Sequence, residues 1–186
     1  MSEVNIKMSK TGKMSLIAPV IVLVCICFVA SFLLAGVYGL TKPIIDELTD
    51  RTNTEARMAV LPTADSFTEI TGVELVNGVN DAFVAKNGAG IVCRTSFNGF
   101  GGAVLLMVGV DANGQITGVQ KLEASETPGI GSNVLADTYL EKFNGKTAAE
   151  EVDFISGASR TSTAVRNGVN AALAQFKAVK AAGLIK

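Results

Sequence analysis

One long apolar run dominates the hydrophobic pattern near the start of the chain. Residues 16–40 have the sequence LIAPVIVLVCICFVASFLLAGVYGL and contain no charged side chain. At about 1.5 Å per residue, a helix of this length exceeds the roughly 30 Å hydrocarbon core of a bilayer. A cleaved signal peptide has a shorter apolar region, of about 7–15 residues, and a small-residue cleavage site that the exit of this run lacks. The pattern therefore predicts a retained transmembrane helix over 16–40, preceded by the segment 1–15.

The positive charges beside this run indicate its orientation. Lys7, Lys10 and Lys13 precede it, whereas Lys42 and Arg51 follow it. Segments that are rich in Lys and Arg tend to remain in the cytoplasm. We therefore expect the N-terminal segment to be cytoplasmic and the chain beyond the span to lie on the extracytoplasmic side.

A second helical pattern follows the span over residues 41–62. Pro43 suits the first turn of a helix, and the pair Leu61 and Pro62 suits its end. The segment has only a partial apolar face. We therefore predict a juxtamembrane helix that connects the span to a domain over 63–186.

Beyond residue 62 the pattern changes to short apolar runs that are separated by turn residues. Asn-Gly pairs at 77–78 and 87–88 are typical of hairpins and tight turns. The clearest hairpin consists of an apolar run over 103–110, a DANG turn and a second run over 115–122. Because the first of these runs is continuously apolar, it predicts a central strand with both faces buried. Hairpins with flanking helices predict an α+β domain with a mainly antiparallel sheet.

The C-terminal part of the domain has the pattern of an amphipathic helix. Its apolar residues recur at the spacing of one helix face, at positions 164, 165, 168 (a glycine), 169, 172, 173, 176 and 179. Thr161 or Ser162 is suited to be the N-cap, because a hydroxyl oxygen accepts a hydrogen bond from a first-turn amide.

Four residues just before this helix form a candidate anion site: Ser156, Gly157, Ala158 and Ser159. The free amides and the positive dipole end of a helix N-terminus attract anions, above all phosphate. Gly157 and Ala158 would let a phosphate approach the backbone closely. The alternative is an ordinary helix start, in which the hydroxyl groups only cap the first turn.

Two further glycine-rich stretches indicate turns. FNGFGG, at 97–102, lacks the spacing of a dinucleotide-binding glycine motif and suits the entry to a strand. ETPGIGS, at 126–132, places Pro128 and Gly129 at the central positions of a type II turn. Neither stretch carries chemistry by itself.

Composition narrows the chemistry that the chain can perform. The 186 residues include no histidine, which excludes Ser-His and Cys-His nucleophile pairs and most zinc sites. Cys25 and Cys27 fall inside the span and Cys93 is alone beyond it, so the spacing supports neither a disulfide framework nor a metal site. The formal net charge of −1 gives no basic surplus for nucleic acid. We therefore expect no catalytic residue, and any redox chemistry would require a cofactor.

The stretch DFISGAS, residues 153–159, resembles the flavinylation motif D-x-x-(S/T)-G-A-(T/S) of FMN-binding domains that carry FMN covalently. The resemblance extends to LTKPIIDELT after the span, GFGGAVLLMVGVDANGQITGV in the middle and ETPGIG before the motif. These stretches have the same order in the G-subunit family of Rnf electron-transport complexes. The C-subunit family of sodium-translocating NADH:quinone reductases is similar.

The resemblance implies that the phosphate of FMN is esterified to Ser159, with Thr161 as the alternative acceptor. In this family the acceptor is most often threonine. The other residues that the resemblance and the helix start assign to the cofactor site are Ser156, Gly157, Ala158 and Ser162 around the acceptor, and Glu126, Thr127 and Gly129 beside the flavin.

The resemblance also implies a function and partners. It indicates a single-pass protein of the cytoplasmic membrane, with its FMN domain outside, that relays electrons in an Rnf-type complex. Such complexes couple electron transfer between ferredoxin and NAD to ion translocation. The implied partners are other membrane, iron–sulfur and flavin subunits, together with a flavin transferase that uses FAD and Mg²⁺.

Two alternatives remain at this point. One is an FMN-carrying subunit of a sodium-translocating NADH:quinone reductase, or another extracytoplasmic flavin electron shuttle. The other is a non-redox, membrane-anchored binding module, in which the motif is only a capped helix.

Overall fold

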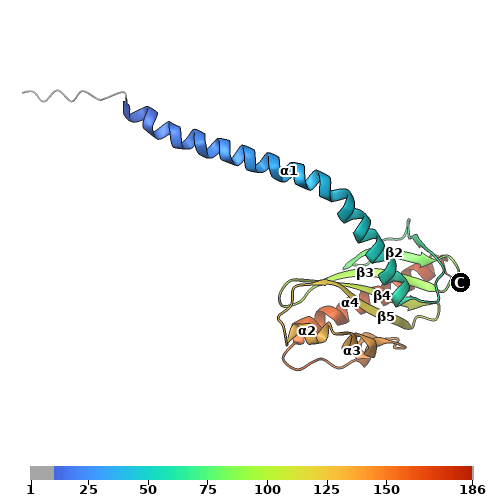
Figure 1. Ribbon diagram of the computed structural model, residues 1–186. Coiled ribbons are helices and arrows are strands. Elements are labelled where there is room, and N and C mark those ends of the chain that lie inside the picture. Colours follow the sequence, from blue (N-terminus) through green and yellow to red (C-terminus); the bar gives the residue numbers. More distant parts are fainter. Residues whose placement is uncertain (1–10, 186) are drawn as a thin grey trace, which may run out of the picture. The chain divides into compact units, whose positions relative to one another are not determined.

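The computed structural model describes residues 11–185. These residues divide into two compact units, with the boundary between Arg51 and Thr52. The first unit holds most of helix α1 (Thr11–Val60). The second unit holds the last residues of α1, a five-stranded sheet and the remaining helices (Figure 1).

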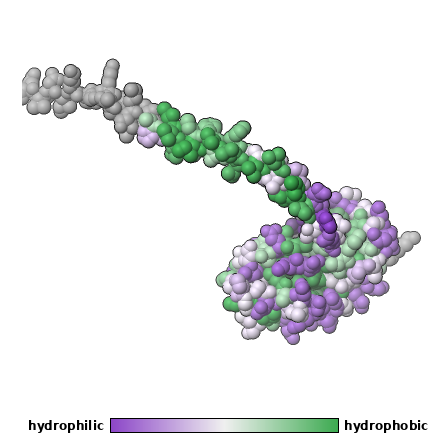
Figure 2. Space-filling model, in the orientation of Figure 1, coloured by the Kyte–Doolittle hydropathy of each residue, from purple (hydrophilic) through white to green (hydrophobic). Residues whose placement is uncertain are grey.

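Helix α1 is apolar on all sides in the region predicted to span the membrane. The large apolar side chains between Val20 and Leu40 are 46% to 80% exposed, and Figure 2 shows them as a continuous hydrophobic surface. A helix that is hydrophobic all round is stable where lipid or protein surrounds it. Within the described residues, α1 is the one helix that is long and apolar enough to cross a membrane. The structure therefore agrees with the predicted N-terminal transmembrane helix.

Pro43 lies inside α1 and does not begin a separate helix. Proline removes one backbone donor from the helix, but its fixed φ near −65° is compatible with helical conformation. The predicted span and the predicted juxtamembrane helix are thus parts of one helix.

The sheet of the second unit is an antiparallel meander, as the hairpin signals predicted. Its strands lie in the chain order β1 to β5, and each pairs with its neighbour in antiparallel fashion. The strands are β1 (Phe67–Glu69), β2 (Val79–Ala85), β3 (Gly90–Asn98), β4 (Ala103–Asp111) and β5 (Ile116–Ala124). The prediction of an α+β fold with a mainly antiparallel sheet is confirmed.

The predicted turns lie where glycine is needed. The Asn-Gly pair at 87–88 connects β2 to β3, with Gly88 at φ +75°, and the DANG turn connects β4 to β5, with Gly114 at φ +86°. The pair at 77–78 turns the chain just before β2, with Gly78 at φ +86°. These positive φ values belong to the left-handed region that glycine adopts without strain.

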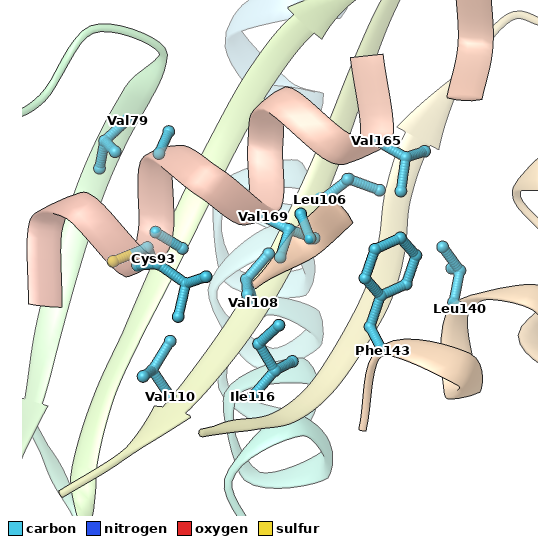
Figure 3. Close-up of a cluster of buried hydrophobic side chains, with 14 of the residues drawn as sticks. Val79, Cys93, Leu106, Val108, Val110, Ile116, Leu140, Phe143, Val165 and Val169 are labelled. Atoms are coloured by element: carbon cyan, nitrogen blue, oxygen red, sulfur yellow. The ribbon is translucent and has the colours of Figure 1, made fainter. Parts of the chain in front are cut away.

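Helix α4 (Ser159–Ala181) covers one face of the sheet. Its buried residues Val165 and Val169 belong to the same apolar cluster as Cys93, Leu106 and Val108 of β3 and β4 (Figure 3). The short helices complete this layer: α2 (Gly131–Val134), α3 (Asp137–Leu140), η1 (Glu141–Phe143) and η2 (Ala149–Glu151).

The last turns of α1 cover the other face. Ala56, Val60 and Leu61 form a second buried cluster with Val92 and Met107 of the sheet. Leu106 and Met107 lie in different clusters, so β4 is buried on both faces, as its continuous apolar sequence predicted. The compact unit therefore begins at Thr52, whereas the sequence placed the start of the domain at residue 63.

Two paired glycines allow the end of α1 to approach the sheet. Gly109 of β4 lies directly opposite Gly118 of β5. A Cβ atom at residue 109 would lie 2.3 Å from the carbonyl oxygen of Val60. A Cβ atom at residue 118 would lie 2.8 Å from the Cα atom of Val60. Thr117 Oγ1 donates a hydrogen bond of 2.5 Å to the same carbonyl oxygen. The helix end is thus fixed against the sheet by backbone contact as well as by apolar packing.

Candidate functional site

The N-terminus of α4 is uncapped. The helix begins at Ser159, and the preceding Ala158 has only a methyl group and makes no side-chain cap hydrogen bond. The first amides of an α-helix have no intrahelical acceptor. These amides and the helix dipole therefore provide partners for an anion at this position.

The prediction that Thr161 or Ser162 is the N-cap is wrong. Gly157, at φ +84°, turns the chain sharply enough for the helix to start at Ser159, so both residues lie inside the first turns. Both side chains are buried, and both form hydrogen bonds with other segments. Ser162 Oγ accepts a hydrogen bond of 3.3 Å from the amide of Ile155, and Thr161 Oγ1 donates one to Glu126. A buried hydroxyl group needs a hydrogen-bond partner, and the partners of these two hydroxyl groups lie outside the helix.

Ser159 differs from these two residues because it is exposed. Its carbonyl oxygen accepts a hydrogen bond of 2.8 Å from Thr163 Oγ1, within the helix. The side chain is therefore on the surface at the start of the helix, where a ligand or an enzyme can reach its hydroxyl group.

The carboxylate of Glu126 joins three segments of the domain. Its Oε1 accepts hydrogen bonds from the amides of Phe100, at 2.9 Å, and Gly101, at 3.3 Å. These residues form the tip of the β3–β4 hairpin, the FNGFGG stretch. Oε2 accepts a hydrogen bond of 3.0 Å from Thr161 Oγ1 in α4. One side chain thus connects the hairpin tip, the ETPG segment and the first turn of α4.

Glycines make room for this carboxylate. A Cβ atom at residue 99 would lie 2.0 Å from Glu126 Oε1, and one at residue 131 would lie 2.4 Å from Oε2. Both distances are shorter than any non-bonded contact, so a larger residue would displace the carboxylate. Gly99 of FNGFGG and Gly131 of ETPGIGS therefore allow close packing around Glu126.

A cavity of about 340 Å³ lies among these three segments. Its volume falls within the range of small-molecule sites. The lining residues are Phe100, Glu126, Thr127, Ile130, Gly131, Gly157, Ala158, Ser159, Arg160 and Thr161.

The comparison with known proteins agrees with this arrangement. The chain is 30% identical over 175 residues to the G subunit of the ion-translocating oxidoreductase complex of Methanosarcina acetivorans, a match that covers 83% of this chain and 90% of the relative. The chain belongs to the G-subunit family of ion-translocating oxidoreductase complexes.

Other matches point to the same family. The G subunit of the sodium-translocating ferredoxin:NAD oxidoreductase complex of Acetobacterium woodii is 28% identical, over 84% of this chain and 89% of the relative. The G subunit of the proton-translocating ferredoxin:NAD oxidoreductase complex of Clostridium ljungdahlii is also 28% identical. This match covers 80% of this chain and 85% of the relative. The sequence model of the FMN-binding domain family matches residues 99–174 of this chain. This range includes every residue that lines the cavity.

The cavity contains six of the nine residues that the sequence assigned to the cofactor: Glu126, Thr127, Gly157, Ala158, Ser159 and Thr161. Three others do not line it. Gly129 forms the predicted turn, at φ +79°, and the amide of Ile130 closes that turn on the carbonyl of Thr127 at 3.3 Å. Ser162 is buried behind the first turn of α4, and Ser156 is exposed beside the cavity-lining Gly157.

Four lining residues were missed by the sequence analysis: Phe100, Ile130, Gly131 and Arg160. The FNGFGG and ETPGIGS stretches contain Phe100, Ile130 and Gly131, and Arg160 directly follows DFISGAS, but these sequences do not show which residues face a cavity.

The residues of this cavity fit FMN. An uncapped helix start suits a phosphate, and the exposed apolar side chains of Phe100 and Ile130 suit an aromatic ring. Across the described residues, no group of His, Cys, Asp and Glu side chains is placed to hold a metal ion.

Proposed function

We propose that this chain is the membrane-anchored flavoprotein subunit of an Rnf-type complex and that it carries FMN as a phosphoester on Ser159. In the complex it would relay electrons during transfer between ferredoxin and NAD, coupled to ion translocation. The observation that carries the proposal is the exposed hydroxyl group of Ser159 at an uncapped helix start, in the lining of the cavity. The family of the chain and the names of its relatives support the same function.

The surroundings of the two candidate hydroxyl groups favour Ser159 over Thr161. Thr161 is 1% exposed, and its hydroxyl group already donates to Glu126. Attachment at Thr161 would break this hydrogen bond and would require an enzyme to reach a buried atom. Ser159 needs neither change.

Attachment requires a separate flavin transferase, as the motif implies. In this step Ser159 Oγ forms a bond to the FMN phosphorus of FAD, the pyrophosphate bond breaks, AMP leaves, and the hydroxyl proton is released. The product is a phosphodiester with one negative charge. The first-turn amides of α4 and the positive end of its dipole would stabilise this charge. A covalent link would also prevent loss of the cofactor from a domain that is outside the cytoplasm.

When bound, the flavin supplies the capacity to accept and donate electrons. The protein residues would hold it in place: the helix start binds the phosphate, and Glu126 fixes the hairpin tip relative to α4. The chain contains no histidine, so any proton transfer at this site would have to use carboxylates or water.

The proposed location is the cytoplasmic membrane, with a single span and the FMN domain on the extracytoplasmic side. The excess of lysine before the span, Lys7, Lys10 and Lys13 against Lys42 and Arg51, supports this orientation. Protease added to spheroplasts, whose cytoplasmic membrane is intact, should digest the domain, whereas digestion only after lysis would contradict the orientation.

Fluorescence of a denaturing gel under ultraviolet light tests the proposed function. The chain is co-expressed with a flavin transferase, and its band should fluoresce because the flavin is covalently bound. The Ser159→Ala variant should be dark, whereas Thr163→Ala, which removes an exposed hydroxyl one turn later, should fluoresce like the wild type. A dark wild-type band would contradict the proposal.

A further inference from the structure

Two large apolar side chains of the cavity lining are exposed without any apolar cover. Phe100 is 71% exposed and Ile130 is 52% exposed. A single exposed apolar residue on a surface needs no explanation. Here, however, the two residues come from separate segments and line the same cavity, which concentrates apolar surface where a ligand would lie.

The position of Phe100 is fixed by its backbone. The hairpin tip is closed by a hydrogen bond of 2.8 Å from the amide of Gly99 to the carbonyl of Gly102. The amides of Phe100 and Gly101 both donate to the carboxylate of Glu126. A Cβ atom at residue 101 would lie 1.9 Å from the carbonyl oxygen of Ser125, so the tip also packs tightly against the chain before Glu126. The backbone that carries the Phe100 ring is therefore in place before any ligand binds.

The same carboxylate links this ring to the helix that carries Ser159. Thr161, two residues after Ser159, donates its hydroxyl hydrogen to Glu126 Oε2. The hairpin tip and the start of α4 therefore have a fixed relative position, set by a single side chain. A ligand anchored at Ser159 would meet the Phe100 side chain at a defined place in the cavity.

We propose that Phe100 is the aromatic wall of the flavin-ring site, with its ring packed against the isoalloxazine, and that Glu126 positions it. This inference rests on the proposed covalent FMN and adds the residue that contacts the ring. Offset packing of two aromatic systems is favourable, and it covers apolar faces on both partners. Ile130 adds aliphatic contact from the ETPGIG segment.

Flavin fluorescence of tryptophan variants tests this contact. An indole in contact with an excited flavin quenches its emission by electron transfer, and this effect is lost within a few ångströms of separation. Phe100→Trp should therefore lower the emission of the folded, flavin-loaded full chain several-fold, and denaturation should restore it. Mass spectrometry of the same sample establishes that the flavin is attached.

Phe154→Trp is the matched control. Phe154 is also an exposed phenylalanine, at 41%, but it does not line the cavity, and the guanidinium of Arg166 lies 3.9 Å from its ring centroid. Its replacement should leave the ratio of native to denatured emission at the wild-type value.

The outcomes separate this inference from the proposed function. Loaded Phe100→Trp protein with the wild-type emission ratio would overturn the aromatic wall and leave covalent FMN intact. If the wild-type emission is already strongly quenched, the visible circular dichroism of the bound flavin should change in Phe100→Ala, and an unchanged spectrum would overturn the inference equally. Failure of the wild-type chain to acquire flavin would instead refute the proposed function.

Discussion

Thr161 donates a hydrogen bond of 3.0 Å to Glu126, and this contact joins the first turn of α4 to the ETPG segment. Thr161 is 1% exposed, so its hydroxyl group has little access to water as an alternative partner. Because the same carboxylate also holds the tip of the β3–β4 hairpin, the contact organises the whole cavity.

Replacement of Glu126 by alanine should destabilise the domain. The buried hydroxyl of Thr161 would lose its acceptor, and such a loss costs about 1–3 kcal/mol of the free energy of unfolding. Denaturant unfolding of the full chain in detergent measures this change. Glu123→Ala removes an exposed carboxylate from the end of β5 and should have little effect. Equal midpoints for the two variants would contradict the structural role of Glu126.

Gly109→Ala should weaken the docking of the end of α1. The new methyl group would lie 2.3 Å from the carbonyl oxygen of Val60, so the helix would have to move away from the sheet. Overpacking of this kind typically costs about 1–3 kcal/mol. Gly36→Ala is the control, because a Cβ atom there would meet nothing within 4 Å. Unchanged unfolding of Gly109→Ala would show that the close approach is absent.

The same docking predicts where a soluble fragment of the domain must begin. A fragment that starts at Thr52 keeps Ala56, Val60 and Leu61 over the sheet, whereas one that starts at Thr63 exposes Val92 and Met107. Each large apolar side chain that loses burial costs about 1.5–3 kcal/mol. We expect cooperative thermal unfolding from the longer fragment and a much lower Tm, or aggregation, from the shorter one. Equal Tm values would contradict the role of the helix end.

Cys93 should be unreactive in the folded protein. Burial raises the pKa of its thiol far above the ordinary value, and the nearby Asp81 carboxylate acts in the same direction. The reactive thiolate is therefore almost absent at neutral or mildly alkaline pH. In a Cys25→Ala and Cys27→Ala background, a thiol reagent at pH 8 should label Cys93 only after unfolding. Rapid labelling of the native protein would show that β3 is not buried as described.

Local patterns predicted the parts of the fold that depend on neighbouring residues. Three elements were predictable because the pattern of their own residues indicates their structure. They are the apolar run of the span, the continuous strand at 103–110 and the helix after residue 163. The conformation of the segment before β2 was harder to predict. There the amide of Val76 donates a hydrogen bond of 2.7 Å to the side chain of Gln175 and not to a strand. A partner 99 residues away cannot be inferred from a local pattern.

The site shows the same limit. The sequence around the motif predicted the helix start, because the motif and the helical pattern after it are adjacent in the chain. The partners of Glu126 come from the hairpin tip and from α4, so neither the role of Glu126 nor the position of Phe100 was predictable from spacing. The N-cap prediction was wrong because the helix already starts at Ser159, and the Thr161 hydroxyl group donates to Glu126, which is distant in the sequence.

Peptide mapping of the flavin-loaded chain tests the central claim most directly. After co-expression with a flavin transferase, mass spectrometry should find a gain of one FMN less one water on the peptide that contains Ser159, with fragment ions that place it on this residue. Ser159→Thr should retain the modification, and Ser159→Ala should lose it. Flavin on Thr161, or modification that persists in Ser159→Ala, would contradict the account.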